Sequence, residues 1–210
     1  MSLFAGEQPS LGIFSTTGIP SIYVPAVAQP AAAGIQLMVP VDGIALDDAV
    51  TQVNPTSATA LMTYNFPNGS LNQLDRVVQV FAAGEVTTGA ESAASQTFAV
   101  TLFDGTNTRT VATWTTGNVT ASQTNLPWEI DLTFAVSVGG TSGAVFGHGG
   151  FAMPLTAPTA AVSEYFDNNT ASTAALNLTQ RITLSVTMLF ASTNASNSVT
   201  QDMMIIQVAN

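Results

Sequence analysis

The single histidine is the side chain in this sequence best suited to acid–base chemistry near neutral pH. His148 lies in the segment FGHGGF, but a catalytic histidine needs a nucleophile or an orienting carboxylate. No G-x-S-x-G pattern supplies the nucleophile. Because the sequence has one histidine and no cysteine, a zinc site is excluded as well. The glycines beside His148 indicate a tight loop rather than a catalytic site.

A pair of carboxylates stands in the segment NLPWEIDLTFAVSV (125–138), in which apolar and polar residues alternate. On a strand, Glu129 and Asp131 share one face with their Cα atoms about 6–7 Å apart, and paired carboxylates can hydrolyse glycosides. An exposed polar face explains them more simply, since like charges there discourage edge-to-edge pairing of strands. We therefore predict that the protein is not an enzyme and has no catalytic residues.

Acidic clusters at Asp47 and Asp48 and in FDNNT (166–170) offer the oxygen ligands that calcium prefers. Neither cluster matches a calcium-binding loop, and no glycine-rich phosphate loop joins a strand to a helix. We predict solvated loops at both places, with no metal and no cofactor.

Aromatic side chains could form a platform for sugars, and the candidates are Tyr64, Trp114, Trp128, Tyr165 and Phe166. Trp128 shares its strand face with the apolar alternation that follows it, so we expect most of these rings in the core. Tyr165 and Phe166 lie next to Asp167 and Asn168 in a predicted loop. These two are the predicted surface contacts.

The elements that carry these residues follow a period of two, which is typical of strands. Turn signals occur in PNGS (67–70) and DGTN (104–107), and the helical candidates at 46–53 and 173–180 are short. The pattern predicts an all-β fold, an antiparallel β-sandwich with a jelly-roll topology or, alternatively, an immunoglobulin-like one. The predicted strands lie within 34–43, 57–66, 76–84, 96–105, 108–115, 125–138, 181–190 and 198–210.

Charge is scarce in this sequence and mostly negative. Charged residues make up 8%, the only cations are Arg76, Arg109 and Arg181, and the net charge is −10. A protein that neutralises nucleic-acid phosphates needs a basic stripe, and anionic membranes attract the same charge, so we predict neither partner. We expect no membrane helix or secretory signal and assembly in a cytoplasm.

Residues 1–33 differ from the rest in composition, so we divide the chain into an arm (1–33) and a β-sandwich body (34–210). Four prolines disfavour helix, while burial of the arm's large apolar side chains would offset the cost of ordering it. The arm either packs on its own body as a first strand or reaches a neighbouring subunit or another protein. The predicted contacts are Leu3, Phe4, Leu11, Ile13, Phe14, Ile19, Ile22, Tyr23 and Val24.

The segment NLPWEIDL and the strand pair TQRITLSVTMLFASTNASNSVTQDMMIIQV resemble the small β-sandwich head-decoration (cement) proteins of tailed bacteriophages. The resemblance covers roughly residues 120–210 in the pattern of their Ser, Thr and Asn-rich strands. It extends to the arm only by analogy. It implies a jelly-roll homotrimer on the outer capsid surface of the virion, where the arm clamps adjacent copies of the major capsid protein. Two alternatives remain: a tail, baseplate or fibre component that binds a host receptor, and a free carbohydrate-binding module.

Overall fold

The structure is a computed structural model that describes residues 13–14, 21–22, 41–46, 49–90, 95–154, 161–168 and 175–209. Of these, residues 13–14, 21–22, 41–46 and 161–168 are described by their backbone alone. The chain divides into two units, Met1–Gln36 and Leu37–Asn210. In the first unit, strands β1 (Ile13–Phe14) and β2 (Ser21–Ile22) pair antiparallel.

The second unit consists of strands and turns, and the described residues contain no helix that could span a membrane. The strands are β3 (Val41–Leu46), β4 (Val50–Val53), β5 (Thr59–Phe66), β6 (Val77–Thr87), β7 (Gln96–Phe103), β8 (Thr108–Thr115), β9 (Leu126–Val138), β10 (Ala144–Pro154), β11 (Ala161–Asn168), β12 (Ile182–Phe190) and β13 (Ser198–Ala209).

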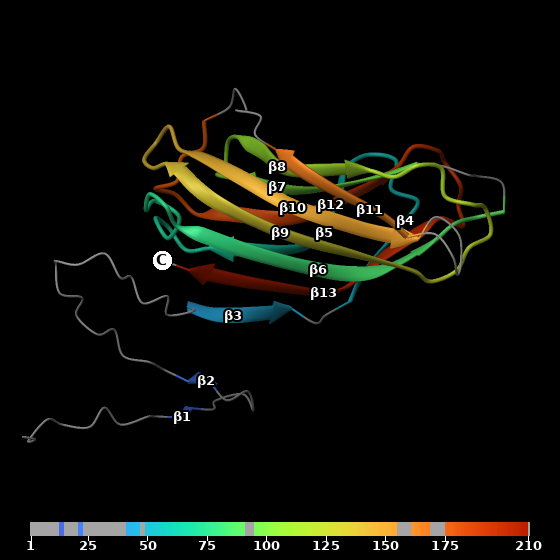
Figure 1. Ribbon diagram of the computed structural model, residues 1–210, viewed down its shortest axis with the longest axis horizontal. Helices are drawn as coiled ribbons and strands as arrows, with labels where there is room; N and C mark the ends of the chain where they lie inside the picture. The colour runs from blue at the N-terminus through green and yellow to red at the C-terminus, as the bar shows by residue number, and fades with distance from the viewer. Residues whose placement is uncertain are drawn as a thin grey trace, which may run out of the picture. The chain divides into compact units, whose positions relative to one another are not determined.

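Two antiparallel sheets pack face to face as a sandwich (Figure 1). The larger, seven-stranded sheet has the order β11-β10-β9-β6-β13-β3, with β4 also paired to β13, and the smaller sheet has the order β5-β12-β7-β8. The all-β sandwich predicted from the strand period is confirmed.

The pairings nest within one another, which defines the jelly roll. Strand β4 pairs with β13, β5 with β12, β6 with β9, and β7 with β8. A long hairpin that folds over itself gives this order, and the prediction of a jelly roll rather than an immunoglobulin-like sandwich is confirmed. The β10–β11 hairpin is an addition that widens the larger sheet next to β9.

The core lies between the sheets and is filled by alternate residues of each strand. In β9, Trp128, Ile130 and Leu132 are at most 2% exposed, while Glu129 and Asp131 between them face solvent. The indole N–H of Trp128 donates a hydrogen bond to the Thr200 carbonyl at 3.2 Å, so the buried ring leaves no polar atom unsatisfied. The alternation of apolar and polar residues in the sequence therefore predicts correctly which side chains of β9 are buried.

An interrupted edge strand replaces the short helix considered at 46–53. Strand β4 (Val50–Val53) pairs with the first part of β13, and β3 pairs with its later part. The β-branched valines of VTQV favour this extended pairing over a helical turn. Asp47 and Asp48, between the two strands, lie outside the described residues.

Both predicted turns are present, with different roles. Asp104 accepts hydrogen bonds from the backbone N–H groups of Thr106 (2.8 Å) and Asn107 (2.6 Å), and Gly105 has a φ of 95°, so DGTN closes the β7–β8 hairpin. The PNGS turn instead ends β5, after which the chain crosses to the other sheet and enters β6.

Candidate functional site: a depression on the seven-stranded sheet

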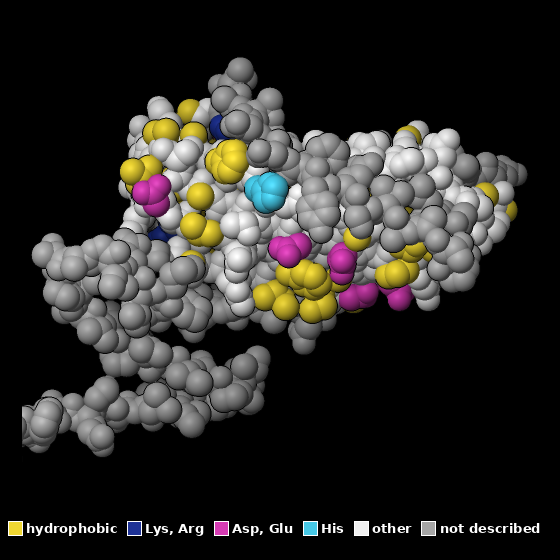
Figure 2. Space-filling model, in the orientation of Figure 1, with side chains coloured by type: hydrophobic (Ala, Val, Ile, Leu, Met, Phe, Trp, Pro, Cys, Tyr) yellow, Lys and Arg dark blue, Asp and Glu magenta, His cyan; other side chains and the backbone are white. Residues whose placement is uncertain are grey.

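An open depression of about 360 Å³ lies on the outer face of the seven-stranded sheet. It is formed over three neighbouring strands, β6, β9 and β10. Figure 2 shows this face, with the histidine, acidic side chains and hydrophobic side chains exposed near one another. The lining residues are Phe81, Glu129, Asp131, Thr133, His148, Gly149, Gly150, Phe151 and Ala152.

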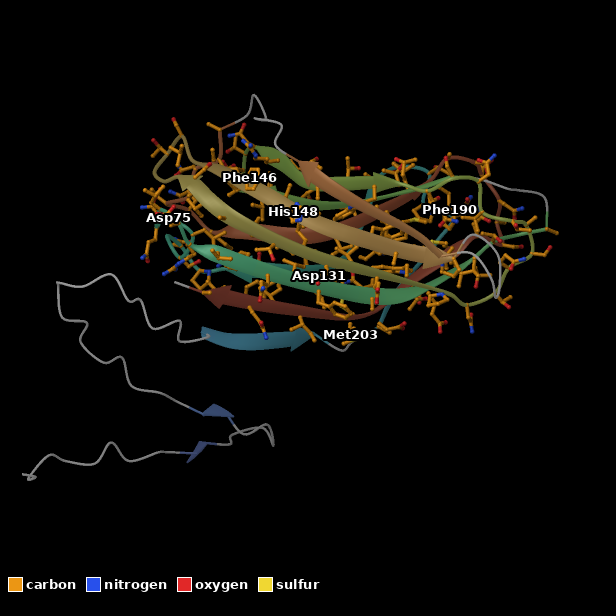
Figure 3. All side chains as sticks on the ribbon, viewed as in Figure 1. Asp75, Asp131, Phe146, His148, Phe190 and Met203 are labelled. Carbon is orange, nitrogen blue, oxygen red and sulfur yellow. The ribbon has the colours of Figure 1, made fainter. Side chains whose placement is uncertain are left out.

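The register of the strands brings these residues together. Asp131 of β9 lies opposite Phe81 of β6 on one side and opposite Gly150 of β10 on the other. Thr133, two residues along β9, lies opposite His148. Opposite residues of antiparallel strands have Cα atoms about 4.5–5.5 Å apart, so the ring, the carboxylate and the imidazole border one small area. His148 and Asp131 are labelled on this face in Figure 3.

Glycines in β10 create the hollow. Gly150 lies on the outer side between His148 and Ala152 and contributes no side chain there. Gly149 faces inward, where a Cβ would lie only 2.4 Å from the Asp131 carbonyl oxygen and 2.7 Å from the Leu132 Cα. Gly147 is similarly crowded by Val111 of β8. These glycines allow close approach of the backbone, which a bulkier strand would prevent.

An aromatic cluster supports the depression from below. Phe151 lines it and is 3% exposed, with its ring centroid 4.8 Å from that of Phe98 and 6.2 Å from that of Trp114. Phe98 also contacts Trp128 at 5.0 Å. Close packing of this kind holds the strands rigidly, so the depression is preformed.

The polar groups at the depression are available to a ligand. Within the described part of the chain, Glu129, Asp131 and His148 take part in no hydrogen bond or ion pair with another side chain, whereas the cation Arg76 is bonded to Ser70 and Gln73. Arg109 is buried at the β8 side of the core and donates to the Val145 carbonyl. The depression is therefore acidic, with hydrogen-bond acceptors facing solvent. No group of His, Asp or Glu side chains among the described residues could hold a metal ion.

The structure corrects several details predicted for these residues. The FGHGGF segment is part of strand β10, not a tight loop, because it pairs with β9 on one side and β11 on the other. Glu129 and Asp131 face solvent as predicted, but β9 is an inner strand between β6 and β10, so they do not guard a sheet edge. The burial of Trp114 and Trp128 agrees with the expectation that most of the candidate aromatic rings lie in the core.

Tyr165 and Phe166 lie in strand β11, not in a loop. The alternation in AVSEYFDN is short, but pairing with β10 along its whole length holds it extended. Tyr165 takes the register position opposite Gly150, next to the depression, and Phe166 the position opposite Gly149. Their side chains lie outside the described part of the structure, so their role as contacts remains a prediction.

The arm contacts predicted from composition fall largely beyond the described residues. Ile13 and Phe14 belong to β1 and Ile22 to β2, for which only the backbone is described. The others, which lie outside the described residues, are Leu3, Phe4, Leu11, Ile19, Tyr23 and Val24.

Phe81 is the residue of this site that the sequence pattern did not single out. In RVVQVFAAG both strand faces are apolar, with Val78 and Val80 inward and Val77 and Phe81 outward. The sequence does contain a feature that could have identified it. Phe81 is the one aromatic residue on the face of β6 that also carries Gln79 and Glu85.

The opposite surface of the sandwich differs in chemistry. The only charged residue in β5, β7, β8 and β12 is Arg109, which is buried. One row across this sheet consists of hydroxyl residues, namely Thr63, Ser185, Thr101 and Thr110. Thr97 and Thr115 hydrogen-bond to each other at 3.0 Å. This outer face is uncharged.

No family model matches the chain, and no curated protein matches it. Among solved structures, the chain is similar to the CBM2 module of the evolved Dit of Lactobacillus casei BL23 phage J-1, at 11% sequence identity and a TM-score of 0.33. The alignment covers 77% of this chain and 76% of that chain. At this level of similarity, no inference about the present chain rests on it.

Proposed function

We propose that this protein is a non-catalytic structural component of a phage virion, and that its body binds carbohydrate on the host surface through the depression. This corresponds to the receptor-binding alternative left open by the sequence. The observation that carries it is the grouping of Phe81, the two carboxylates, Thr133 and His148 around one preformed hollow on a solvent-facing sheet.

Such a lining suits a sugar. The carboxylates of Glu129 and Asp131 accept hydrogen bonds from neighbouring hydroxyls, the more strongly because they are charged. The partly exposed Phe81 ring offers an apolar surface to the C–H face of a pyranose. The depression is open to water, which favours reversible binding over catalysis that depends on a water-excluded site.

A glycan array probed with the labelled full-length chain tests this function, with Phe81→Ala as the decisive variant. We expect binding to a defined set of glycans. Phe81→Ala should weaken the affinity for them about tenfold or more, because it removes the ring on which the sugar stacks. Phe146→Ala is the matched control, because Phe146 is 39% exposed on β10 and does not line the depression. Absence of binding to every glycan, or equal loss in both variants, would contradict the proposal.

Capsid decoration by a homotrimer, with the major capsid protein as partner, is the second candidate. The uncharged outer face of the four-stranded sheet favours it, since copies that each carry a net charge of −10 can associate there without bringing carboxylates together. Immunogold electron microscopy of source virions separates the two functions. Label on the tail supports receptor binding, and a regular array over the head supports decoration.

A further inference from the structure

We infer that the depression selects carbohydrates by charge: it prefers sugars that carry a free ammonium group and rejects sugars that carry a carboxylate. This inference rests on the proposed function and specifies its ligand class. It follows from the identity and surroundings of Glu129 and Asp131.

The two carboxylates have no cationic partner among the described residues. Both are exposed on β9 and line the depression, and neither forms an ion pair there. Their Cα atoms are about 6–7 Å apart on one strand face, so a single ammonium group between them can contact both. A ligand carboxylate in the same place would meet two like charges.

The surrounding sheet surface adds to this negative field. Glu85 of β6 and Asp202 of β13 are also exposed on the larger sheet. Figure 2 shows the acidic side chains gathered on this face beside a hydrophobic cluster. The described arginines lie elsewhere: Arg109 is buried, Arg76 is bonded within the turn that precedes β6, and the exposed Arg181 directly precedes β12 of the other sheet. A field of one sign steers cationic ligands toward the surface and repels anionic ones.

Phe81 gives the ammonium group a second attraction. Phe81 lies directly opposite Asp131 on the neighbouring strand, so a cation held by the Asp131 carboxylate is within reach of the Phe81 ring. The face of an aromatic ring attracts cations through its quadrupole. The same ring also packs against a pyranose face, so one sugar unit with an amino group can use the ring and the carboxylates together.

The test compares tetrasaccharides of glucosamine, N-acetylglucosamine and glucuronate-containing hyaluronan by calorimetry with the full-length protein. The measurements are made at about pH 6, where sugar amino groups are protonated and aspartate and glutamate side chains in general are ionised. We expect the glucosamine tetrasaccharide to bind about tenfold more tightly than the acetylated one, as two exposed ion pairs allow. Hyaluronan should not bind, and added salt should reduce the difference.

Asp131→Asn leaves Glu129 in place and should reduce the preference for glucosamine to about threefold, while binding to the acetylated tetrasaccharide persists. Asp202→Asn is the matched control, since it removes the same charge from the same sheet outside the depression, and it should keep the preference. Equal affinity of the wild-type protein for both tetrasaccharides would overturn the charge selection and leave the proposed function intact. A wild-type protein that binds no glycan on the array would instead overturn the proposed function.

Discussion

Asp104 shows how one residue fixes a turn and makes stability depend on pH. Burial raises the pKa of its carboxyl, but hydrogen bonds from the backbone N–H groups of Asn107, Asn177 and Thr106 outweigh this and lower the pKa to about 2. Since the folded-state pKa is depressed, the ionised carboxylate stabilises the fold. This contribution is fully present at pH values above the pKa of the same carboxyl in the unfolded chain, which is near 3.8. The contribution is lost as the pH falls through about 2.

Replacing Asp104 by Asn should lower the free energy of unfolding at pH 7 by about 1–2 kcal/mol. This figure is smaller than the full pKa shift implies, because solvent screens part of the interaction. Urea unfolding at pH 7 and at pH 2 measures the effect. The difference between the two proteins should shrink at the lower pH, and a difference that is the same at both would contradict the assigned role.

Gly149 allows β10 to lie close to β9 because it has no side chain. A Cβ there would lie 2.4 Å from the carbonyl oxygen of Asp131, a backbone atom that cannot move without parting β9 from β10. We expect Gly149→Ala to lower the free energy of unfolding by about 1–3 kcal/mol, as overpacking usually does. Urea denaturation gives the value, and an unchanged midpoint would show that the two strands are not held in contact as described.

At the scale of elements, the strands that alternate strictly were predictable from the sequence, and their partners were not. The alternation in β9 and β12 reports one buried face, which is a local property. Whether β9 lies at an edge or inside a sheet depends on pairing with β6 and β10, which no local pattern encodes. The interpretation of Glu129 and Asp131 as edge charges failed for this reason.

Strand β10 was not predicted from the sequence because its glycines have a weak intrinsic preference for strands. Gly147, Gly149 and Gly150 suggest a loop by propensity, yet pairing on both sides holds β10 extended. Five of the nine residues that line the depression lie on this strand. The depression could therefore not be assembled from the sequence, although Glu129 and Asp131 were considered as a pair and His148 by itself.

The four-stranded sheet provides a prediction about self-association. If copies of the protein associate through the uncharged outer face of this sheet, a charge placed at the centre of that face would have to be buried in the interface. The cost of burying it would prevent association. We expect Thr101→Arg to convert an oligomer into a monomer in sedimentation experiments. Gln79→Arg, on the exposed face of β6, is the control and should leave the oligomer unchanged. An oligomer that survives Thr101→Arg would place the interface elsewhere.

At the scale of the whole molecule, the division at residues 36 and 37 predicts that the body folds without the arm. Every residue of the described hydrophobic core lies between Leu61 and Ile206. Deletion of residues 1–33 should shift the thermal unfolding midpoint by no more than about 3 °C, which corresponds to roughly 1 kcal/mol for a chain of this size. Circular dichroism on heating measures it, and loss of cooperative unfolding would show that the arm completes the fold.

Binding of carbohydrate at the depression is the central claim, and backbone amide NMR of the full-length chain tests it most directly. The protein is titrated with the glycan that binds most tightly on the array. The account predicts shifts at Phe81, Asp131 and Gly150, with Thr101 and Thr187 on the opposite sheet unchanged. Shifts confined to the four-stranded sheet, or no shifts at saturating glycan, would contradict it.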